Sequence, residues 1–556
     1  MKNMSKNTYF LLLVSCVVTA SLVGTPVYAQ DKTAEIDKIF NWTKPNEPGC
    51  TVAVSQHGKL LMNRAYGLAD LERDVQLSPG SVFDAGSLRK QFIAAAVLLL
   101  VEDGKVSLSD DIRKHIPELP DYGHKITVDH LLTHTSGIRD WTGLLPLAGG
   151  NTDALTLILR QRGLNFAPGE EWSYSNSGYV LLTDIVARAS GMPFVEFSRK
   201  RLFEPLGMKT TRYVDDMKVV IKNRALAYAK SGNSWKWDMK LDNDRGGGAL
   251  FTTAADLSVW NEALTSARLG GFVTDKLQEP ASLNNGRKLS YARGLNVDTY
   301  RDGKRVWHSG AAAGYSSLLA RFPDQAVSVA IMCNLDEGAQ GAYASRIIDL
   351  FLPPAVAESS VGANARAANA GGAGVTGVDL NGRAGLFFNE QNGQPLRLAV
   401  NNNTLTIAGG GPLVALASDR FRNQRASLFF MSLAEFDLRF LSSDQFEIET
   451  KEGTKTRYAR AQPYTPNEAD LQAFAGRYRS DEIGAFFDIA PGKDRLMGRA
   501  NDAPGPALEF RPVDRDTFQL AGVILRFRRD KAGKVLAVDY SNPVVRNIKF
   551  MRVNDR

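Results

Sequence analysis

The sequence predicts an α/β domain, in which an antiparallel sheet with flanking helices carries an inserted helical subdomain, followed by all-β C-terminal domains of the antiparallel barrel type. Strand-like stretches lie around residues 49–66 and 305–333, and the chain between them reads mostly as helices and loops. Beyond residue 378, helix signals nearly vanish. A chain of 556 residues has room for two to four domains of ~100–200 residues each.

The N-terminus has the pattern of a secretion signal. Lys2 and Lys6 precede an apolar stretch at residues 9–23, and a Val-Tyr-Ala cleavage site follows at residues 27–29. We therefore expect residues 1–29 to be a signal peptide and the processed chain to be periplasmic or secreted. A membrane-spanning helix is the alternative, but the stretch is short and interrupted by Ser and Thr. No later apolar run reaches spanning length, so no stable membrane span is expected after processing.

Three cysteines are present. Cys16 lies in a lipobox-like sequence, but apolar residues continue well past it, so ordinary cleavage is favoured over a lipoprotein anchor. Cys50 and Cys333 each lie in an apolar, strand-like stretch, and two buried thiols are the simplest interpretation. An oxidising compartment would also permit a disulfide. Neither cysteine has a spacing that indicates a metal site.

The expected first domain, residues 30–354, begins with a hairpin at 49–66 and a long helix from Leu88 to Asp103. This helix is apolar on nearly every face and should run through the core. A closing helix at 345–352 has Ser345 as its expected N-cap and ends at two prolines. The other expected elements are helices at 177–189 and 256–265 and strands at 305–307, 315–322 and 327–333.

Residues 355–378 are rich in Ala, Gly, Ser and Asn and are interpreted as a flexible linker. Short alternating stretches then recur between turns, which is typical of antiparallel barrels or sandwiches. They lie at residues 395–400, 404–407, 436–440 and 523–528.

The C-terminal region contains an internal repeat with an offset of 91 residues. The pattern Asp379-Leu380 followed by Ala384-Gly385 recurs as Asp470-Leu471 followed by Ala475-Gly476, and Leu405 and Leu496 keep the same offset. The repeat predicts two β-rich domains, at residues 379–464 and 465–556.

The net charge of +7 is scattered, and no block of five or more like charges occurs. The charge pattern therefore disfavours a nucleic-acid partner. A mildly basic protein could still favour an anionic cell wall.

Ser87 and Lys90 form a Ser-x-x-Lys motif at the start of the long apolar helix. Residues three apart share a helix face, so the Lys90 amine can reach the Ser87 hydroxyl. The helix N-terminus favours the negative charge of an alkoxide, and a lysine in an apolar site can lose its proton near neutrality. Alone, the motif is expected by chance in a chain of this length.

Tyr174 and Asn176 lie in a loop before a helix, where the phenol could relay a proton and the amide could hold a substrate. His308 and Gly310 follow the strand at 305–307, and backbone N–H groups there could bind an oxyanion. Taken singly, a surface Tyr and Asn and a structural histidine are equally compatible with the sequence. His130 and His134 are four apart, but no Glu follows His130, so a metal site is disfavoured.

Together, in this order, the three motifs resemble the penicillin-recognising serine hydrolases, which include class C β-lactamases, serine DD-peptidases, D-aminopeptidases and related esterases. Three surrounding segments are also similar to this family, and the resemblance covers about residues 35–350. These segments are residues 128–137 (VDHLLTHTSG), Pro168-Gly169 before residues 172–174, and Gly247-Gly248 before residues 252–256.

The resemblance implies a β-lactamase/DD-peptidase-like fold and a site without metal or cofactor. It implies Ser87 as nucleophile, Lys90 as its base, Tyr174 as the group that protonates the leaving group and later activates water, and His308 as a group that stabilises charge and helps to recognise a substrate terminus. The substrate would be bound by Asn176, Gly310 and Ala311, with the N–H groups of Ser87 and Ala311 as the oxyanion hole.

The chain has His-Ser-Gly where class C β-lactamases carry Lys-Thr-Gly. A histidine is largely neutral at pH 7, which weakens a fixed positive charge for a β-lactam carboxylate. The expected function is therefore hydrolysis of a small peptide, amide or ester, possibly derived from the cell wall, with D-amino-acid selectivity implied by the resemblance. Two alternatives remain open: a promiscuous esterase or β-lactamase, and a penicillin-binding sensor or cell-wall binding protein with little turnover.

The fold of this family also bears on the two remaining cysteines. In it the first and last strands of the sheet are antiparallel neighbours, so a disulfide between Cys50 and Cys333 is possible.

Overall fold

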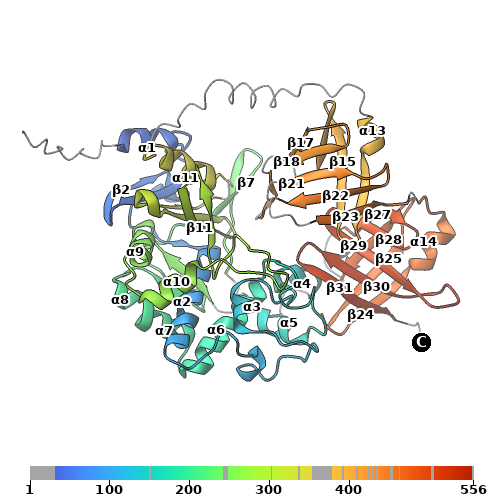
Figure 1. Cartoon of the computed structure of the whole chain (residues 1–556), viewed down its shortest axis with the longest axis horizontal. Helices are drawn as coiled ribbons and strands as arrows, with labels where there is room; N and C mark the ends of the chain where they lie inside the picture. The colour runs from blue at the N-terminus through green and yellow to red at the C-terminus, as the bar shows by residue number, and fades with distance from the viewer. Residues whose placement is uncertain are drawn as a thin grey trace, which may run out of the picture.

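The computed structural model places the α/β part of the chain beside two β-barrels, which confirms the predicted fold class (Figure 1). It describes residues 32–148, 152–241, 248–301, 303–335, 339–352, 379–390, 393–407, 411–423, 426–428, 431–433, 436–450, 455–462, 464–501 and 506–553. The expected signal peptide and the expected linker lie outside these ranges. No helix within them is long and apolar enough to span a bilayer.

A six-stranded antiparallel sheet organises the first part of the chain, with the strand order β10-β11-β12-β13-β1-β2. The two distant strand-bearing segments meet where β1 pairs with β13, from Cys50 opposite Cys333 to Gln56 opposite Val327. Both strands are buried almost throughout, as their Val-rich sequences predict. The strands are β1 (Cys50–Gln56), β2 (Lys59–Tyr66), β10 (Asn296–Tyr300), β11 (Gly303–Ala312), β12 (Tyr315–Phe322) and β13 (Val327–Cys333).

Helices cover both faces of this sheet. On one face, α1 (Thr33–Ile39) and α11 (Gln340–Asp349) pack on Val52, Val54 and Ile331. On the other face lie α2 (Arg89–Glu102) and α9 (Ala254–Thr265), whose Phe92 and Trp260 rings are 4.3 Å apart at their centroids. Helix α2 is buried from Arg89 to Leu100, which fits its apolar character on every face.

The predicted helical insertion is present beside α2 and carries α6 against it (Figure 1). Its helices are α3 (Val128–Leu132), α4 (Trp141–Ala148), α5 (Ala154–Arg160), α6 (Asn176–Ser190), α7 (Phe194–Ser198) and α8 (Glu204–Leu206), with α10 (Gly271–Gln278) following α9. Two small sheets here had no clear signal in the sequence. One joins β5 (Phe83–Asp84), β9 (Ala249–Thr252) and β6 (Arg212–Val214), and the other pairs β7 (Tyr228–Ser231) with β8 (Ser234–Trp237).

Cys50 and Cys333 form a disulfide, so the simplest interpretation of two free thiols is wrong. They are direct cross-strand partners in the β1–β13 ladder, with their Cα atoms 4.0 Å apart. The strand register, which composition does not reveal, brings the two sulfur atoms together.

The closing helix also differs from the prediction. Helix α11 begins at Gln340 and ends at Asp349, so Ser345 lies inside it and is not its N-cap. The buried residues of this helix begin with Gln340, Tyr343 and Ala344, before the expected start.

Two closed eight-stranded barrels follow. The first contains β14 (Gly385–Asn389), β15 (Pro395–Asn401), β16 (Thr404–Ile407), β17 (Gly411–Ala415), β18 (Arg420–Asn423), β21 (Phe436–Phe440), β22 (Gln445–Thr450) and β23 (Lys455–Arg460), with the hairpin β19 (Ala426–Leu428) and β20 (Met431–Leu433) between β18 and β21. The second contains β24 (Gly476–Ser480), β25 (Ala485–Pro491), β26 (Leu496–Ala500), β27 (Leu508–Asp514), β28 (Thr517–Leu520), β29 (Val523–Arg529), β30 (Val535–Asn542) and β31 (Val545–Arg552).

The two barrels share local details, as expected of an internal repeat. A short helix precedes each one, α13 (Leu380–Arg383) and α14 (Glu468–Phe474). In each barrel, an arginine on the last strand donates hydrogen bonds to two carbonyl oxygens just before the first strand. The sets are Arg460 with Gly382 and Ala384, and Arg552 with Ala473 and Ala475.

Candidate active site

Ser87 lies in a tight turn, Gly86–Leu88, directly before α2. Gly86 makes this turn possible, because its φ is +55° and a methyl group there would lie 2.6 Å from the backbone nitrogen of Ala311. The Gly86 N–H donates to Asp84 Oδ1 over 2.9 Å. The turn therefore holds Ser87 half-buried between the start of α2 and the strand β11.

Lys90 lies one turn further along α2 and is fully buried. Its Nζ is 3.2 Å from Ser87 Oγ and 2.8 Å from Asn176 Oδ1. Burial disfavours the ammonium form and lowers the pKa of Lys90 well below its usual value, and the nearby Arg89 lowers it further. A neutral amine at this distance can accept the proton of the serine hydroxyl.

Tyr174 lies in the loop before α6, and Lys90 Nζ is 4.6 Å from the centre of its ring. The Tyr174 side chain also hydrogen-bonds Ser87. Burial raises the pKa of Tyr174, while the contact with Ser87 lowers it in part, so the phenol remains protonated at neutral pH. In this state Tyr174 can give a proton to a neighbouring atom and take one back.

Asp140 orients Asn176, the first residue of α6. Its Oδ2 accepts hydrogen bonds from the backbone N–H of Asn176 and, over 3.1 Å, from the side-chain Nδ2. With Nδ2 committed to Asp140, the amide oxygen of Asn176 faces Lys90 Nζ. Asp140 is 1% exposed, and Thr142 donates to its other oxygen. None of the three sequence motifs contains Asp140, although it lies three residues beyond the family-like segment 128–137.

Gly310 brings β11 into contact with the Ser87 turn. A methyl group at Gly310 would lie 2.1 Å from the carbonyl oxygen of Ala85 and 3.1 Å from the backbone nitrogen of Ser87. Pairing of β11 with β10 ends at Trp307, so the segment from His308 to Ala312 continues past the end of that edge strand. The strand therefore runs through the His-Ser-Gly motif, whereas the sequence pattern predicts a strand that ends before the motif.

The His308 side chain, two residues before Gly310 on β11, is buried and only 4% exposed. Its Nδ1 is 2.5 Å from the carbonyl oxygen of Ser309, and its Nε2 is 3.2 Å from the hydroxyl of Tyr291. Burial and the nearby Lys90 lower the pKa of His308 to about 3, so the imidazole is neutral at pH 7.

The pair His130 and His134 has structural contacts. His130 completes a capping box with Thr127 at the start of α3, and its Nδ1 accepts from the Thr127 N–H over 3.2 Å. His134 Nδ1 accepts from the Ser175 N–H over 3.1 Å, which fixes the loop that carries Tyr174. Within the described ranges, no group of three or more His, Cys, Asp or Glu side chains could hold a metal ion.

Comparison with known proteins decides the family. The family model described as Beta-lactamase matches residues 37–352, more than half of the chain. The chain belongs to the beta-lactamase family. This confirms the resemblance drawn from the three motifs and makes the chain a serine hydrolase of that family.

Individual members of the beta-lactamase family match different lengths of the chain. Penicillin-binding protein 4* of Bacillus subtilis (strain 168) is 30% identical over 313 residues, 52% of this chain and 68% of that protein. A D-aminopeptidase of Brucella melitensis biotype 1 is 24% identical over 536 residues, 91% of this chain and 96% of that protein.

Two solved structures share the fold. The octameric penicillin-binding protein homologue from Pyrococcus abyssi has a TM-score of 0.51 at 20% identity and covers 77% of this chain and 99% of its own. D-amino acid amidase from Ochrobactrum anthropi SV3 has a TM-score of 0.50 at 23% identity and covers 57% of this chain and 98% of its own.

The second barrel packs on the helical insertion of this beta-lactamase-family domain. Arg139 and Glu482 form an ion pair over 2.6 Å with side chains only 5% and 14% exposed. The β30–β31 turn contributes the Val544 carbonyl, which accepts from the N–H of Asp140 over 3.4 Å. Arg546, at the start of β31, pairs with Glu171 over 2.9 Å. The second barrel is thus in contact with the segment that orients Asn176.

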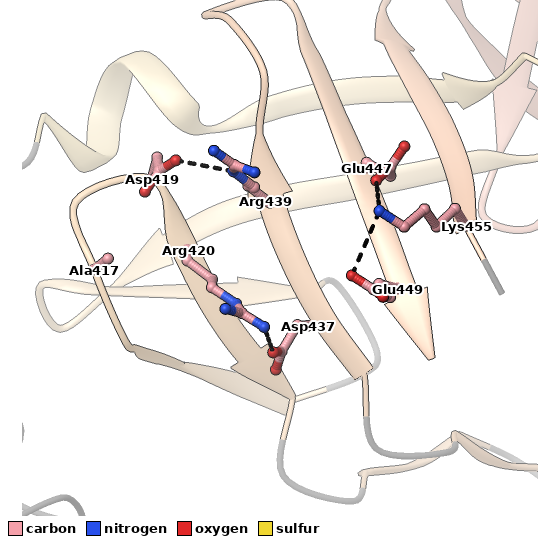
Figure 2. Close-up of a pocket in the computed structure, with 8 residues that line it drawn as sticks. All are labelled: Ala417, Asp419, Arg420, Asp437, Arg439, Glu447, Glu449 and Lys455. Carbon is pink, nitrogen blue, oxygen red and sulfur yellow. Dashed lines mark hydrogen bonds and ion pairs between the residues drawn. The ribbon is translucent and has the colours of Figure 1, made fainter. Parts of the chain in front are cut away.

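A separate pocket lies on the first barrel and has no part in this chemistry. Its volume is about 390 Å³, and Figure 2 shows that charged side chains line it. The charges pair with one another, as in Asp419 with Arg439 and Arg420 with Asp437, while Lys455 contacts both Glu447 and Glu449. Its lining contains no Ser, Thr, Cys or His side chain, and we interpret it as a surface network of ion pairs.

Proposed function

We propose that this chain is an exported serine hydrolase that acts through an acyl-enzyme on peptide, amide or ester substrates containing D-amino acids. One observation carries the proposal: the buried Lys90 amine, whose pKa is lowered, lies 3.2 Å from Ser87 Oγ. A serine hydroxyl becomes a useful nucleophile only when a base takes its proton, and Lys90 is that base.

In the acylation step, Ser87 Oγ attacks the substrate carbonyl carbon and its proton passes to Lys90 Nζ. The carbonyl oxygen becomes an oxyanion, which the N–H groups of Ser87 and Ala311 would bind across the Gly310 contact. When the tetrahedral intermediate collapses, the bond to the leaving nitrogen or oxygen breaks, and Tyr174 supplies a proton to the leaving group.

In the deacylation step, water attacks the ester carbonyl carbon and gives a proton to the Tyr174 phenolate. The bond from this carbon to Ser87 Oγ then breaks, and Lys90 returns its proton to Ser87 Oγ. Asn176 holds the substrate amide beside this pair, and its own orientation depends on Asp140. We assign His308 the role of a neutral group that borders the substrate. A role as a charge-stabilising cation conflicts with its lowered pKa.

Two observations support D-amino-acid substrates over β-lactams. A neutral His308 offers no cation for the carboxylate of a β-lactam, which disfavours efficient β-lactam hydrolysis. The similarity to a D-aminopeptidase extends through both barrels, over 91% of this chain, which favours D-amino-acid substrates. A cell-wall origin of such substrates is part of the proposal.

Export is supported by the signal pattern at residues 1–29 and by the disulfide between Cys50 and Cys333. Structural disulfides are typical of oxidising compartments and rare in the cytosol. We therefore propose a periplasmic or secreted location.

The test uses the processed chain beginning at Gln30, with Ser87→Ala as the variant and Ser107→Ala as an exposed control. Rates are compared on D-alanine amide, L-alanine amide, a short-chain ester and a cephalosporin, and a fluorophosphonate adduct is mapped by mass. We expect turnover led by the D-amide, an adduct on Ser87, and loss of both in Ser87→Ala. Full activity of Ser87→Ala would refute the mechanism, and dominant cephalosporin turnover would refute the substrate class.

A penicillin-binding sensor with little turnover is a second candidate, favoured by the 30% identity to the Bacillus subtilis penicillin-binding protein. A sensor of this kind would form a stable penicillin adduct on Ser87 that is not released, and it would turn over none of the four substrates. The intact Ser87, Lys90 and Tyr174 arrangement favours the hydrolase.

A further inference from the structure

Three buried side chains that the proposed mechanism leaves partly unexplained form a continuous chain of contacts. His134, Tyr291 and His308 are 1%, 3% and 4% exposed. They come from the segment after α3, the segment before β10, and β11. The Tyr291 hydroxyl is 3.1 Å from His134 Nε2 and 3.2 Å from His308 Nε2, so it bridges the two rings.

The tautomer of His134 follows from its backbone contact. Its Nδ1 accepts the N–H of Ser175 over 3.1 Å and therefore carries no proton. Burial lowers the pKa of His134 well below its usual value, so the ring is neutral and its proton is on Nε2. Nε2–H then donates to the Tyr291 oxygen.

The tautomer of His308 follows in the same way. Its Nδ1 is 2.5 Å from the Ser309 carbonyl oxygen, which can only accept, so Nδ1 carries the proton. In the neutral ring Nε2 is then an acceptor, and the Tyr291 hydroxyl is placed to donate to it. Tyr179 also contacts this hydroxyl, but an imidazole nitrogen is the stronger acceptor.

Hydrogen bonds are therefore donated from His134 to Tyr291 and from Tyr291 to Nε2 of His308. Nδ1 of His308 donates to the Ser309 carbonyl, so both ring nitrogens of His308 are engaged. The titratable groups facing His308 and this chain from the surrounding elements are Lys90, Tyr174, Tyr179, Tyr291 and His134. None of them is a carboxylate that would stabilise an imidazolium.

We propose that Tyr291 is a positioning residue that holds His308 as its neutral Nδ1–H tautomer, so that the enzyme prefers substrates without a free carboxylate next to the scissile bond. This inference rests on the proposed function, which it deepens. A carboxylate placed against His308 would find no N–H to bind and would lose its hydration without compensation. Peptide amides and esters have no such cost.

The test compares the wild type with Tyr291→Phe, using D-Ala-D-Ala and D-Ala-D-Ala amide, which differ in their terminal charge. Phe removes the hydroxyl and leaves His308 Nε2 free to take a proton and donate to a carboxylate. We expect the ratio of kcat/KM for the carboxylate substrate to kcat/KM for the amide to rise at least ~10-fold, mainly through KM. Tyr478→Phe, a buried tyrosine of the second barrel, is the matched control, with its hydroxyl 2.7 Å from the Phe474 carbonyl oxygen.

A second measurement does not depend on turnover. In ¹⁵N-histidine-labelled protein, with the His308 signals assigned from His308→Gln, the wild type should show a protonated Nδ1 and a bare Nε2 near pH 7. In Tyr291→Phe the Nε2 signal should shift and titrate at a higher pH. An Nε2–H tautomer or an imidazolium in the wild type would overturn the proposal, as would unchanged signals and an unchanged ratio in the variant. If neither dipeptide is hydrolysed by any form, the proposed function fails, while the histidine signals still decide the role of Tyr291.

Discussion

Replacing Asp140 with Asn tests how the site is held together. The Asp140 carboxylate accepts from both the backbone and the side chain of Asn176 through one oxygen, and from Thr142 through the other. In Asp140→Asn one oxygen becomes an NH₂ group, so one of these two sets of donors loses its acceptor. A hydrogen bond to a charged group contributes about 1.5–3 kcal/mol. Because tenfold in rate is about 1.4 kcal/mol, we expect kcat/KM to fall about 10–100-fold.

A double-mutant cycle with Asn176→Ala separates orientation from other effects. If Asp140 acts through Asn176, Asp140→Asn should cost little in the Asn176→Ala background, whereas independent effects would add. The assay is kcat/KM on the best amide substrate, with the melting temperature measured in parallel. Asp256→Asn is the control, because Asp256 accepts three comparable hydrogen bonds from Thr210 and Thr211 at a site that lacks the catalytic motifs. An equal loss in both backgrounds, or no loss in a folded variant, would refute the reasoning.

Three further outcomes follow from the structure. His308 has a folded pKa of about 3, below its unfolded value of about 6.5. The free energy of unfolding should therefore decrease as the pH falls from about 6.5 to about 3, by up to ~1.4 kcal/mol per pH unit. Denaturant titration should show a shallower dependence on pH in His308→Gln. Glu482→Gln leaves Arg139 charged and buried, and should destabilise the chain by about 3–5 kcal/mol in urea, whereas a loss of a few tenths would show that the pair is solvated. Gly310→Ala places a methyl group 2.1 Å from the Ala85 carbonyl and should abolish fluorophosphonate labelling, while Gly271→Ala, where a methyl group has nothing within 4 Å, should label normally.

The sequence predicted the parts of the fold that local patterns determine. Strands β12 and β13 have the expected bounds because each is a short strand-like run, buried along its whole length and bounded by turn residues. The all-round apolar character of α2 likewise predicted a buried helix, and with it a buried Lys90 next to Ser87. Three motifs far apart in the chain were predicted to converge because their order resembles a family, and the structure does bring Ser87, Lys90, Tyr174 and Asn176 together.

The features that the sequence did not predict depend on contacts between distant segments. Asp140 and Tyr291 are single residues whose roles appear only when α3, α6 and β11 are packed together. Cys50 and Cys333 pair because of the register between β1 and β13. The β7–β8 hairpin lacks a strong apolar alternation, and Trp237 within it is 60% exposed, so its strands had no core-facing pattern.

The bond between Cys50 and Cys333 makes a covalent ring of the polypeptide, since 283 positions separate the two residues. The whole helical insertion, the three proposed reacting side chains Ser87, Lys90 and Tyr174, and His308 beside them belong to that ring. A single proteolytic cut in one of its exposed loops would therefore produce two fragments that stay tethered until a reductant is added. In an extracellular setting rich in proteases, a nicked molecule could keep its working parts assembled.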